Sequence, residues 1–400
     1  MEANKTPEIR FKGFSAAWEQ RKFSDLTDRV SIQSSDSDLP QVEYEDIVSG
    51  EGTLNKDLRD KEGGKTGIKF YAGDVLYGKL RPYLMNWLYP QFNGVAVGDF
   101  WVLRATKCDS SFLYRLIQTN NFQRLANVSS GSKMPRADWN LISQSFFAVP
   151  ADHAEQKAIA KSLAELDSLI TLHQRKCDKL MKLKSAMLDR MFPKPGDSEP
   201  EIRFAAFKEP WGRYKLGDVA AIARGERFTA SDYVESGGIP CIHYGEIYTS
   251  YGTIATKTIS QVSSSLKDSL RYAKQGDVIV AATSENVEDV CKAVVWMGNS
   301  PVAYHDDSFA LTFSGDPIFL VSFFETSEFF TQKSSAAHGV KVMRVSSDSL
   351  ADVDLPLPSA AEQRLIGGYF AKLDNLITLH RRKIKGLKKI KSAMLDKMFV

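Results

Sequence analysis

The chain has 400 residues, of which 43% are hydrophobic and 25% charged, and its formal net charge is +3. This length favours two domains, and the composition is that of a globular protein and excludes long disordered stretches. No apolar window of about 20 residues is present, so we expect no membrane span. The four cysteines lack a paired spacing and the first residues lack a signal peptide. We therefore expect a reducing, cytoplasmic setting without a disulfide framework or a structural zinc site.

Three sequence blocks occur twice along the chain. Glu8-Ile9-Arg10-Phe11 returns at 201–204, and Ala72-Gly73-Asp74-Val75 is answered at 275–278. The longest block, 167–192, aligns without gaps to 374–399, with 18 of 26 positions identical. Little identity remains between the blocks. Uneven drift of this kind predicts a constant part that does one job twice and a variable part that does two related but different jobs.

The variable parts, residues 1–150 and 201–357, each have the pattern of a mixed α/β domain. Short apolar runs at 74–77 and 100–103, and at 277–280 and 309–312 in the second half, predict strands. Helical spacing predicts one helix over 112–125 and its counterpart over 319–333. The Pro-, Gly- and charge-rich residues 193–200 indicate a linker between the halves.

The constant parts, residues 151–192 and 358–400, predict two long helices. Apolar residues recur at alternating steps of four and three, which is typical of a coiled-coil seam, with Lys184 and Lys391 as its polar breaks. The seam positions are Ile159, Leu163, Leu166, Ile170, His173, Cys177, Leu180, Met187 and Met191, repeated as Ile366, Phe370, Leu373, Ile377, His380, Ile384, Leu387, Met394 and Met398.

Each helix would have about 35–40 residues and a length of roughly 55–60 Å, and the two would most simply pair with each other. His173 and His380 occupy the same seam slot, where a polar residue fixes register more simply than it binds a metal. Six Lys/Arg against two Asp at 175–190, and eight against one at 381–397, fit either a solvated helix face or a basic track along a polyanion.

Candidate nucleic-acid contacts lie in loops that mix cations with hydroxyl, amide and aromatic groups. Such loops donate to phosphates and to base edges, although a solvated loop is the alternative for any single residue. The candidates are Lys79, Arg81, Tyr83, Ser132, Lys133 and Arg136 in the first domain and Arg224, Arg227, Ser284, Asn286, Lys341 and Arg344 in the second.

Signatures of catalysis are missing from the sequence. There is no G-x-G-x-x-G, and Gly64-Lys65-Thr66 lacks the first glycine of a phosphate loop. No Asn/Asp-Pro-Pro-aromatic tetrapeptide is present. Glu155 and Lys157 match half of a nuclease motif, but they stand at a helix start, where an acid is explained by the helix dipole. We expect no catalytic residue, metal or cofactor in this chain.

These features together resemble the specificity (S) subunits of type I restriction–modification systems. The matching positions are Glu155-Gln156, 166–173 and 184–192, with their counterparts Glu362-Gln363, 373–380 and 391–399. The loops at 77–83 and 129–139 are also similar to those of a first target-recognition domain. The resemblance covers nearly the whole chain.

The resemblance implies two globular target-recognition domains separated by two long antiparallel coiled-coil helices, with pseudo-twofold internal symmetry. Each domain would read one half of a split, asymmetric site in double-stranded DNA. The helices would dock two methyltransferase (M) subunits that methylate adenine N6, and helix length would set the unread spacer. Restriction (R) subunits would add ATP-driven cleavage. S-adenosylmethionine, ATP and Mg²⁺ would then lie on partner subunits. The implied docking residues are Leu166, Ile170, His173, Met187, Leu373, Ile377, His380 and Met394.

Two other classes of function stay open at this point. One is a reader retained from a larger methyltransferase–nuclease, against which the missing catalytic motifs count. The other is a coiled-coil scaffold without a nucleic-acid partner. It predicts binding that is indifferent to salt, whereas DNA binding weakens steeply as salt rises.

Overall fold

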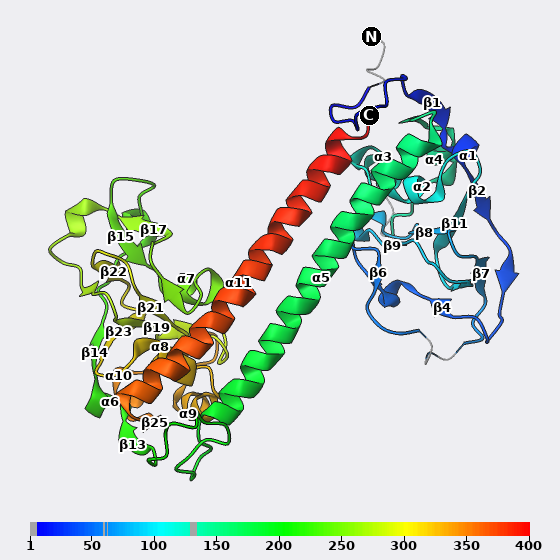
Figure 1. Cartoon of the computed structure of the whole chain (residues 1–400). Coiled ribbons are helices and arrows are strands. Elements are labelled where there is room, and N and C mark those ends of the chain that lie inside the picture. Colours follow the sequence, from blue (N-terminus) through cyan, green and yellow to red (C-terminus); the bar gives the residue numbers. More distant parts are fainter. Residues whose placement is uncertain (1–5, 59–60, 62, 129–133) are drawn as a thin grey trace. The chain divides into compact units, whose positions relative to one another are not determined.

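A computed structural model describes residues 6–58, 61, 63–128 and 134–400, which divide into two compact units. Unit 1 comprises residues 1–173 and 383–400, and unit 2 comprises residues 174–382. The division falls within both long helices, α5 (His153–Met191) and α11 (Ala360–Lys397) (Figure 1). Each unit therefore contains one globular domain and a segment of both helices. No helix in the described part of the chain is both long enough and apolar enough to cross a membrane.

The described part of unit 1 has two four-stranded sheets and two strand pairs. One sheet has the order β2 (Thr27–Val30), β11 (Phe100–Ala105), β8 (Val75–Gly78), β9 (Trp87–Leu88). The other has the order β3 (Gln33–Ser34), β7 (Gly67–Phe70), β10 (Gly94–Ala96), β4 (Gln41–Val42). The strand pairs are β1 (Glu19–Lys22) with β12 (Phe146–Val149), and β5 (Ile47–Val48) with β6 (Thr53–Leu54). The helices are α1 (Phe23–Leu26), α2 (Ser110–Leu116), α3 (Asn120–Ala126) and α4 (Trp139–Gln144), with 3-10 turns η1 (Tyr44–Asp46) and η2 (Pro82–Leu84).

Unit 2 repeats this plan. Its larger sheet has the order β14 (Ala220–Arg224), β23 (Ser308–Phe313), β19 (Val278–Ala281), β21 (Ala293–Trp296), β16 (Ile254–Ala255). The second sheet has the order β17 (Ser260–Val262), β15 (Ile239–Ile242), β22 (Val302–Tyr304), β18 (Tyr272–Ala273). The pairs are β13 (Gly212–Lys215) with β25 (Asp354–Leu357), and β20 (Thr283–Ser284) with β24 (Met343–Arg344). The helices are α6 (Leu216–Val219), α7 (Tyr244–Thr249), α8 (Pro317–Phe323), α9 (Ser327–Ala336) and α10 (Ser347–Ala351), with η3 (Ala230–Asp232) and η4 (Ser264–Leu266).

The predicted mixed α/β fold and its four predicted strands are confirmed, since β8, β11, β19 and β23 fall on the apolar runs. The two predicted domain helices are wrong in one respect, because each is broken into two. Thr119 accepts a hydrogen bond from the Phe122 amide and starts α3, and Thr326 does the same for Phe329 and α9. Each threonine hydroxyl also donates to a carbonyl three residues back, 2.7 Å away, which closes the preceding helix. Such local bonds compete with helix continuation.

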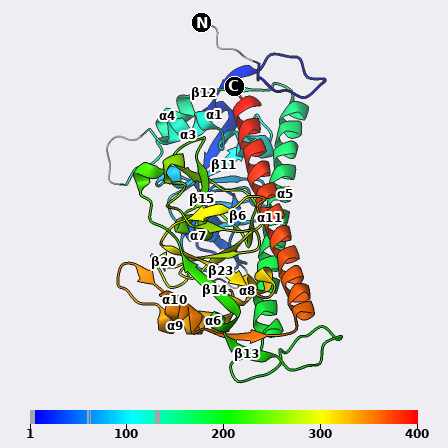
Figure 2. The ribbon, with the colours of Figure 1, turned by 90° about the vertical axis from the view of Figure 1, so that its left-hand side faces the viewer.

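The core of each unit is completed by the end of the helix that comes from the other half of the sequence. In unit 1, Met398 and Phe399, just after the end of α11, are buried, and the Phe399 ring centroid lies 6.2 Å from that of Trp18. In unit 2, Phe192 just after α5 lies 5.2 Å from Phe319. Figure 2 shows the end of α11 beside the start of α5 in unit 1. Full burial of one such ring contributes about 1.5–3 kcal/mol, which explains why the Met-Phe ending is repeated.

The first repeated block fastens the start of each helix to its domain. The Arg10 guanidinium donates to both carboxylate oxygens of Glu155, at 2.6 and 2.7 Å, and Arg203 does the same to Glu362 at 2.8 and 2.9 Å. Both glutamates are at most 1% exposed. The Arg10 guanidinium therefore occupies the carboxylate that had matched half of a nuclease motif. A bidentate pair of this kind fixes geometry as well as charge.

Candidate nucleic-acid interface

One backbone frame, made of three hydrogen bonds, surrounds the loop that follows the central strand of unit 1. The Gly78 amide donates to the Asn86 carbonyl over 2.6 Å and the Lys79 amide to the Asp99 carbonyl over 2.9 Å. The Ala137 amide donates to the Lys79 carbonyl over 2.8 Å. These bonds bring three segments that are distant in the sequence together, where β8 ends and β11 begins. We call the enclosed residues 79–85 reader turn 1.

Unit 2 has the same frame around a different loop. The Ala281 amide donates to the Lys292 carbonyl over 2.9 Å, and the Ala282 amide donates to the Asp307 backbone carbonyl over 2.9 Å. The Val345 amide donates to the Ala282 carbonyl over 3.0 Å. The enclosed residues 282–291 are reader turn 2. The frame makes Asp99 equivalent to Asp307. It also makes Arg136 equivalent to Arg344, because their neighbours Ala137 and Val345 donate the matching bonds.

Both reader turns close on a left-handed residue that is not glycine. In the described part of the chain such residues are Arg81 (φ 50°), Met85 (φ 53°) and Cys291 (φ 62°). Met85 directly precedes Asn86, and Cys291 directly precedes Lys292, so the two hold the same place in the frame. Side chains other than glycine adopt this conformation at a cost of about 1–3 kcal/mol, and they cluster at binding sites and ligand clamps.

Reader turn 1 is cationic and is organised by Asp99. The Asp99 carboxylate lies 3.0 Å from Arg136 Nη2 and 3.5 Å from Lys79 Nζ. The Tyr44 hydroxyl accepts from the Leu80 amide over 3.1 Å and donates to the Asp99 carbonyl over 2.5 Å. Burial raises the pKa of Tyr44 above its usual value, so this hydroxyl keeps its proton. Tyr44 therefore links the turn to the backbone of Asp99, the residue whose carboxylate positions the cations.

The predicted first-domain residues are brought together where the structure describes them. Arg81, Tyr83 and Arg136 are exposed and Lys79 is half-buried, and the Arg81 amide donates to the Pro135 carbonyl over 2.7 Å. Ser132 and Lys133 lie outside the described residues. The four described candidates thus share one surface, although they come from two separate loops.

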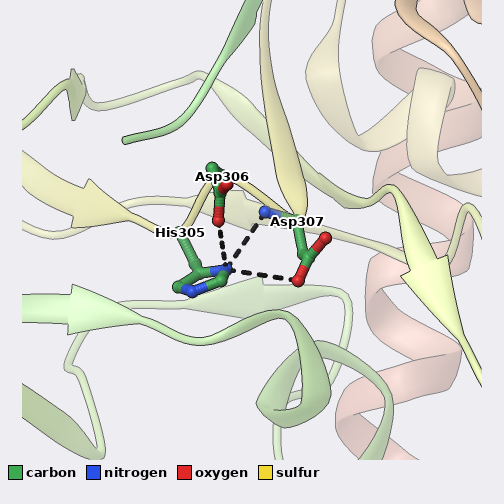
Figure 3. Close-up of side chains that lie close together, drawn as sticks. All are labelled: His305, Asp306 and Asp307. Atoms are coloured by element: carbon green, nitrogen blue, oxygen red, sulfur yellow. Dashed lines mark hydrogen bonds and ion pairs between the residues drawn. The ribbon is translucent and has the colours of Figure 1, made fainter. Parts of the chain in front are cut away.

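In unit 2 the turn between β22 and β23 takes the place of Asp99. Its residues His305, Asp306 and Asp307 lie together in Figure 3. Asp307 accepts from the Thr283 hydroxyl over 2.9 Å, and the Asp306 carbonyl accepts from Arg224 Nε over 2.8 Å. This turn therefore holds both the strand of reader turn 2 and one predicted cation.

This group does not fit a metal ion, although its donor types do. His305 Nδ1 accepts from the Asp307 amide over 3.1 Å. The other ring nitrogen, Nε2, lies 3.0 Å from the Phe228 carbonyl oxygen, to which it must therefore donate. Neither ring nitrogen keeps a lone pair for coordination. The cluster is a structural turn.

A buried lysine fixes the backbone of reader turn 2 by hydrogen bonds. Lys333, 5% exposed, donates through Nζ to the carbonyls of Glu288 and Val290, at 2.9 and 2.7 Å. Burial lowers the pKa of Lys333. The Asn286 amide donates to the Asp289 carboxylate over 2.9 Å and accepts from the Asp289 backbone over 2.8 Å. The turn is therefore rigid before any ligand binds.

The predicted second-domain residues are only partly brought together. Arg224, Arg227, Lys341 and Arg344 are exposed, and the Thr283–Arg344 strand pair places Arg344 beside reader turn 2. Ser284 is 2% exposed and donates to the Asn286 carbonyl, so its hydroxyl does not face solvent. We remove Ser284 from the candidate base contacts. Asn286 is exposed, but its amide is already bonded to Asp289.

Sequence reasoning missed the residues that organise these turns, chiefly Tyr44, Asp99, Asp307 and Lys333. A usable signal was present for two of them, because Asp99 directly precedes the predicted strand at 100–103 and Asp307 stands two residues before the predicted strand at 309–312. Tyr44 and Lys333 act from distant parts of the chain, and no local pattern marks them.

The helix residues predicted to dock partners are mostly turned inward. Ile170, Leu373 and Ile377 are each 6% exposed, and Leu166, His173, Met187, His380 and Met394 are half-buried. These residues build the seam and the cores, so they are weak candidates for a partner surface. Six exposed apolar residues of the helices form another repeated set, which is Leu169, Leu172 and Ile390 in unit 1 and Leu376, Leu379 and Leu183 in unit 2.

Comparisons with known proteins agree with this architecture. Residues 208–389 match the family described as Type I restriction modification DNA specificity domain. The MjaVIII specificity subunit of Methanocaldococcus jannaschii is 22% identical over 334 residues, or 81% of this chain and 75% of that protein. The EcoDI specificity subunit of Escherichia coli is 29% identical over 133 residues, or 32% of this chain and 30% of that protein. The solved S subunit from M. genitalium has a similar fold, with a TM-score of 0.62 at 13% identity over 99% of both chains.

Proposed function

We propose that this chain is a specificity subunit of a type I restriction–modification system, without catalysis of its own. In this proposal it reads a split DNA site, with one unit for each half-site. The observation that best supports this proposal is that equivalent sets of three backbone hydrogen bonds hold two turns with different side chains. A shared frame with exchanged side chains is what two related readers with different targets require. Base edges differ in their pattern of donors and acceptors, so unlike turns select unlike half-sites.

The charges of the two turns support contact with DNA. Lys79 and Arg81 belong to reader turn 1, Arg136 shares the Asp99 carboxylate with Lys79, and Arg344 lies beside reader turn 2. Cations at a loop edge pair with phosphates and position the protein, whereas the side chains at the tip read bases. Arg136 and Arg344 occupy equivalent frame positions, so we assign them equivalent roles at the two half-sites.

The paired helices dock two methyltransferase subunits in this proposal. Its support is the exposed apolar set that recurs in both units, with Leu169 and Leu172 equivalent to Leu376 and Leu379. Identical exposed side chains on repeated helices suit two copies of one partner. The partners supply S-adenosylmethionine chemistry at adenine N6, and restriction subunits add ATP-dependent cleavage with Mg²⁺.

Long-read methylation sequencing of a host that expresses this chain with its methyltransferase tests the proposal. We expect a split motif with a fixed spacer. Replacing residues 24–150 by another first domain should change one half of the motif and leave the other unchanged, and a change in both halves would refute independent reading. Removing one heptad from both helices should shorten the spacer.

A gel-shift series over salt concentration with the methyltransferase present tests the same proposal without a host. Specific binding should weaken steeply as salt rises, because the contacts displace counterions from the DNA. A complex without any preferred sequence would favour a scaffold instead.

A further inference from the structure

Reader turn 1 carries an exposed apolar tip. Tyr83, Leu84 and Met85 follow one another in the sequence and are 54%, 38% and 40% exposed. Single exposed apolar residues are ordinary, but three in succession on one turn form a continuous apolar projection. Such a surface marks a contact with a partner.

The tip is rigid. Arg81 and Met85, at its two ends, are both left-handed. Within the tip, the Leu84 amide donates to the Arg81 carbonyl over 2.8 Å, and the Met85 amide donates to the Pro82 carbonyl over 2.9 Å. Behind it the Ser49 hydroxyl donates to the Leu84 carbonyl, and the Gly50 amide donates to the Met85 carbonyl over 3.0 Å. The backbone therefore holds the side chains outward before any partner arrives.

The surroundings of the tip specify a polyanion as the partner. Arg81 stands at its base, and Lys79 and Arg136 lie beside it on the Asp99 carboxylate. An apolar projection flanked by cations suits a duplex, whose phosphates lie outside and whose base faces are apolar. Reader turn 2 lacks this character, since its exposed positions include Glu285, Asn286 and Glu288. The feature belongs to one half-site only.

We propose that Tyr83, Leu84 and Met85 form an apolar wedge that enters the duplex at one base step of the first half-site and partly unstacks it. This inference rests on the proposed reading of DNA and extends it. Leucine and methionine are side chains that proteins insert between base pairs, and an aromatic ring can stack on the exposed base. The energy of unstacking depends on sequence and is lowest at pyrimidine–purine steps. The wedge therefore reads a TA, CA or TG step without hydrogen bonds to it.

The test uses the full chain in complex with its methyltransferase subunits and a duplex that contains the mapped motif. 2-Aminopurine replaces each adenine of the motif in turn, on either strand, except the two adenines that become methylated, because a methyltransferase flips its own target base out of the stack. Binding should raise its fluorescence several-fold at one step of the first half-site and at no step of the second. The triple variant Tyr83→Ser, Leu84→Ser, Met85→Ser should lose that signal and bind the motif about tenfold more weakly, as expected when base stacking is removed.

Two controls separate misfolding from loss of the wedge. Ile32→Ser changes another exposed apolar residue of unit 1, 57% exposed, and should keep the signal. The conservative Leu84→Met variant should keep most of it. Unchanged fluorescence in the wild-type complex, despite specific binding, overturns the wedge and leaves the reading of DNA intact. Absence of any specific binding by the wild type overturns the proposed function itself. Loss of co-purified methyltransferase in the triple variant assigns the tip to that protein and also overturns the wedge.

Discussion

The ammonium group of Lys184 on α5 lies 2.6 Å from the carboxylate of Asp374 on α11. The equivalent pair in unit 1, Lys391 and Asp167, is 2.7 Å apart. Lys184 and Lys391 are the polar breaks in the apolar seam, and both pairs join the end of one repeated block to the start of the other. The breaks therefore fix the antiparallel register of the two helices within each unit, a use of buried polar groups known from coiled coils.

A third charged group, supplied by the domain, joins each of these pairs. Glu325 lies 2.5 Å from Lys184 in unit 2, whereas Arg115 lies 2.5 Å from Asp167 in unit 1. The domains thus add charges of opposite sign to the same helix pair. The repeated Lys–Asp pair offers both a cation and an anion, so a domain can pair with it through a residue of either charge.

The Lys184→Met substitution should destabilise unit 2. The Lys184 side chain is 13% exposed, and without it the carboxylates of Asp374 and Glu325 lose their shared cation. We expect a loss of about 1–3 kcal/mol, less than for a fully buried pair because Glu325 is 39% exposed. Urea unfolding of the isolated chain, followed by circular dichroism, measures it. Adding Asp374→Leu should restore part of the loss, while Lys182→Met on the exposed face should change little. A double variant that is less stable than Lys184→Met would contradict the register pair.

The Asp99→Asn substitution should relax sequence reading at the first half-site only. Without the carboxylate, the Arg136 guanidinium and the Lys79 ammonium lose their fixed positions, but their charges stay. We expect a degenerate base in one half of the methylated motif, with non-specific affinity unchanged or higher. Methylation sequencing reports the motif, and Asp138→Asn, at an exposed helix cap, is the matched control. Full retention of the motif would remove Asp99 from the reading apparatus.

The Tyr44→Phe substitution should weaken the same frame without changing any charge. It removes the hydroxyl that bonds the Leu80 amide and the Asp99 carbonyl, and it leaves a half-buried amide without this partner. We expect a destabilisation of about 1–3 kcal/mol, together with reduced specific binding at the first half-site. Thermal unfolding and gel shifts measure the two effects. Tyr71→Phe, on an exposed tyrosine of the same unit, should have neither effect.

The repeated elements were predictable because repetition is written in the sequence. The helices, the central strands and the clamp residue Glu155 all lie in or beside repeated blocks or apolar runs. The points at which the two domain helices divide, Thr119 and Thr326, were not predictable. The helical spacing of apolar residues continues through them, and a single threonine hydroxyl determines where one helix ends and the next begins. The seam assignment shows the opposite limit. A 3.5-residue period identifies the buried face, so Ile170 and Ile377 were found, but it says nothing about which outward residues meet a partner.

The reader turns were predictable in place but not in chemistry. Cations at 79–81 and 136 indicated one surface, and the frame unites them. Whether a polar side chain points outward or bonds to its own loop depends on contacts between distant segments. Ser284 and Asn286 looked like ligands for bases because the bonds that occupy them do not follow from composition. The apolar tip at 83–85 was partly hidden for the same reason, since its exposure depends on the left-handed Arg81 and Met85.

Substituting the exposed leucines of one unit should remove one methyltransferase subunit. Leu169 and Leu172 are 43% and 45% exposed in unit 1, and Leu376 and Leu379 are 44% and 47% exposed in unit 2. We expect each Leu→Ser double variant to bind one methyltransferase instead of two, and the quadruple variant none, by native mass spectrometry. The matched control is Lys176→Ser with Lys383→Ser, equivalent exposed positions on the same helices. Two bound subunits in the quadruple variant would exclude this surface as the docking face.

Acid should weaken unit 1 through Glu43. The Glu43 carboxylate, 17% exposed, accepts from Lys65 over 2.7 Å and from Lys61 over 2.9 Å, and these bonds hold its pKa below the ordinary 4.5. The folded state therefore favours the charged form. Its stabilising contribution is complete above the unfolded pKa and is lost as pH falls through the folded pKa. Glu43 directly precedes Tyr44, so the frame of reader turn 1 depends on the same contacts.

The Glu43→Gln variant isolates this contribution. At pH 7 it should melt at a lower temperature than the wild type, and the difference should shrink as pH falls below about 4.5, because the wild-type carboxyl then becomes neutral as well. Glu45→Gln, at a side chain that is 70% exposed, serves as the control and should show little difference at any pH. A difference for Glu43→Gln that stays constant from pH 7 to pH 3 would mean that packing, and not the charge on Glu43, stabilises this corner of unit 1.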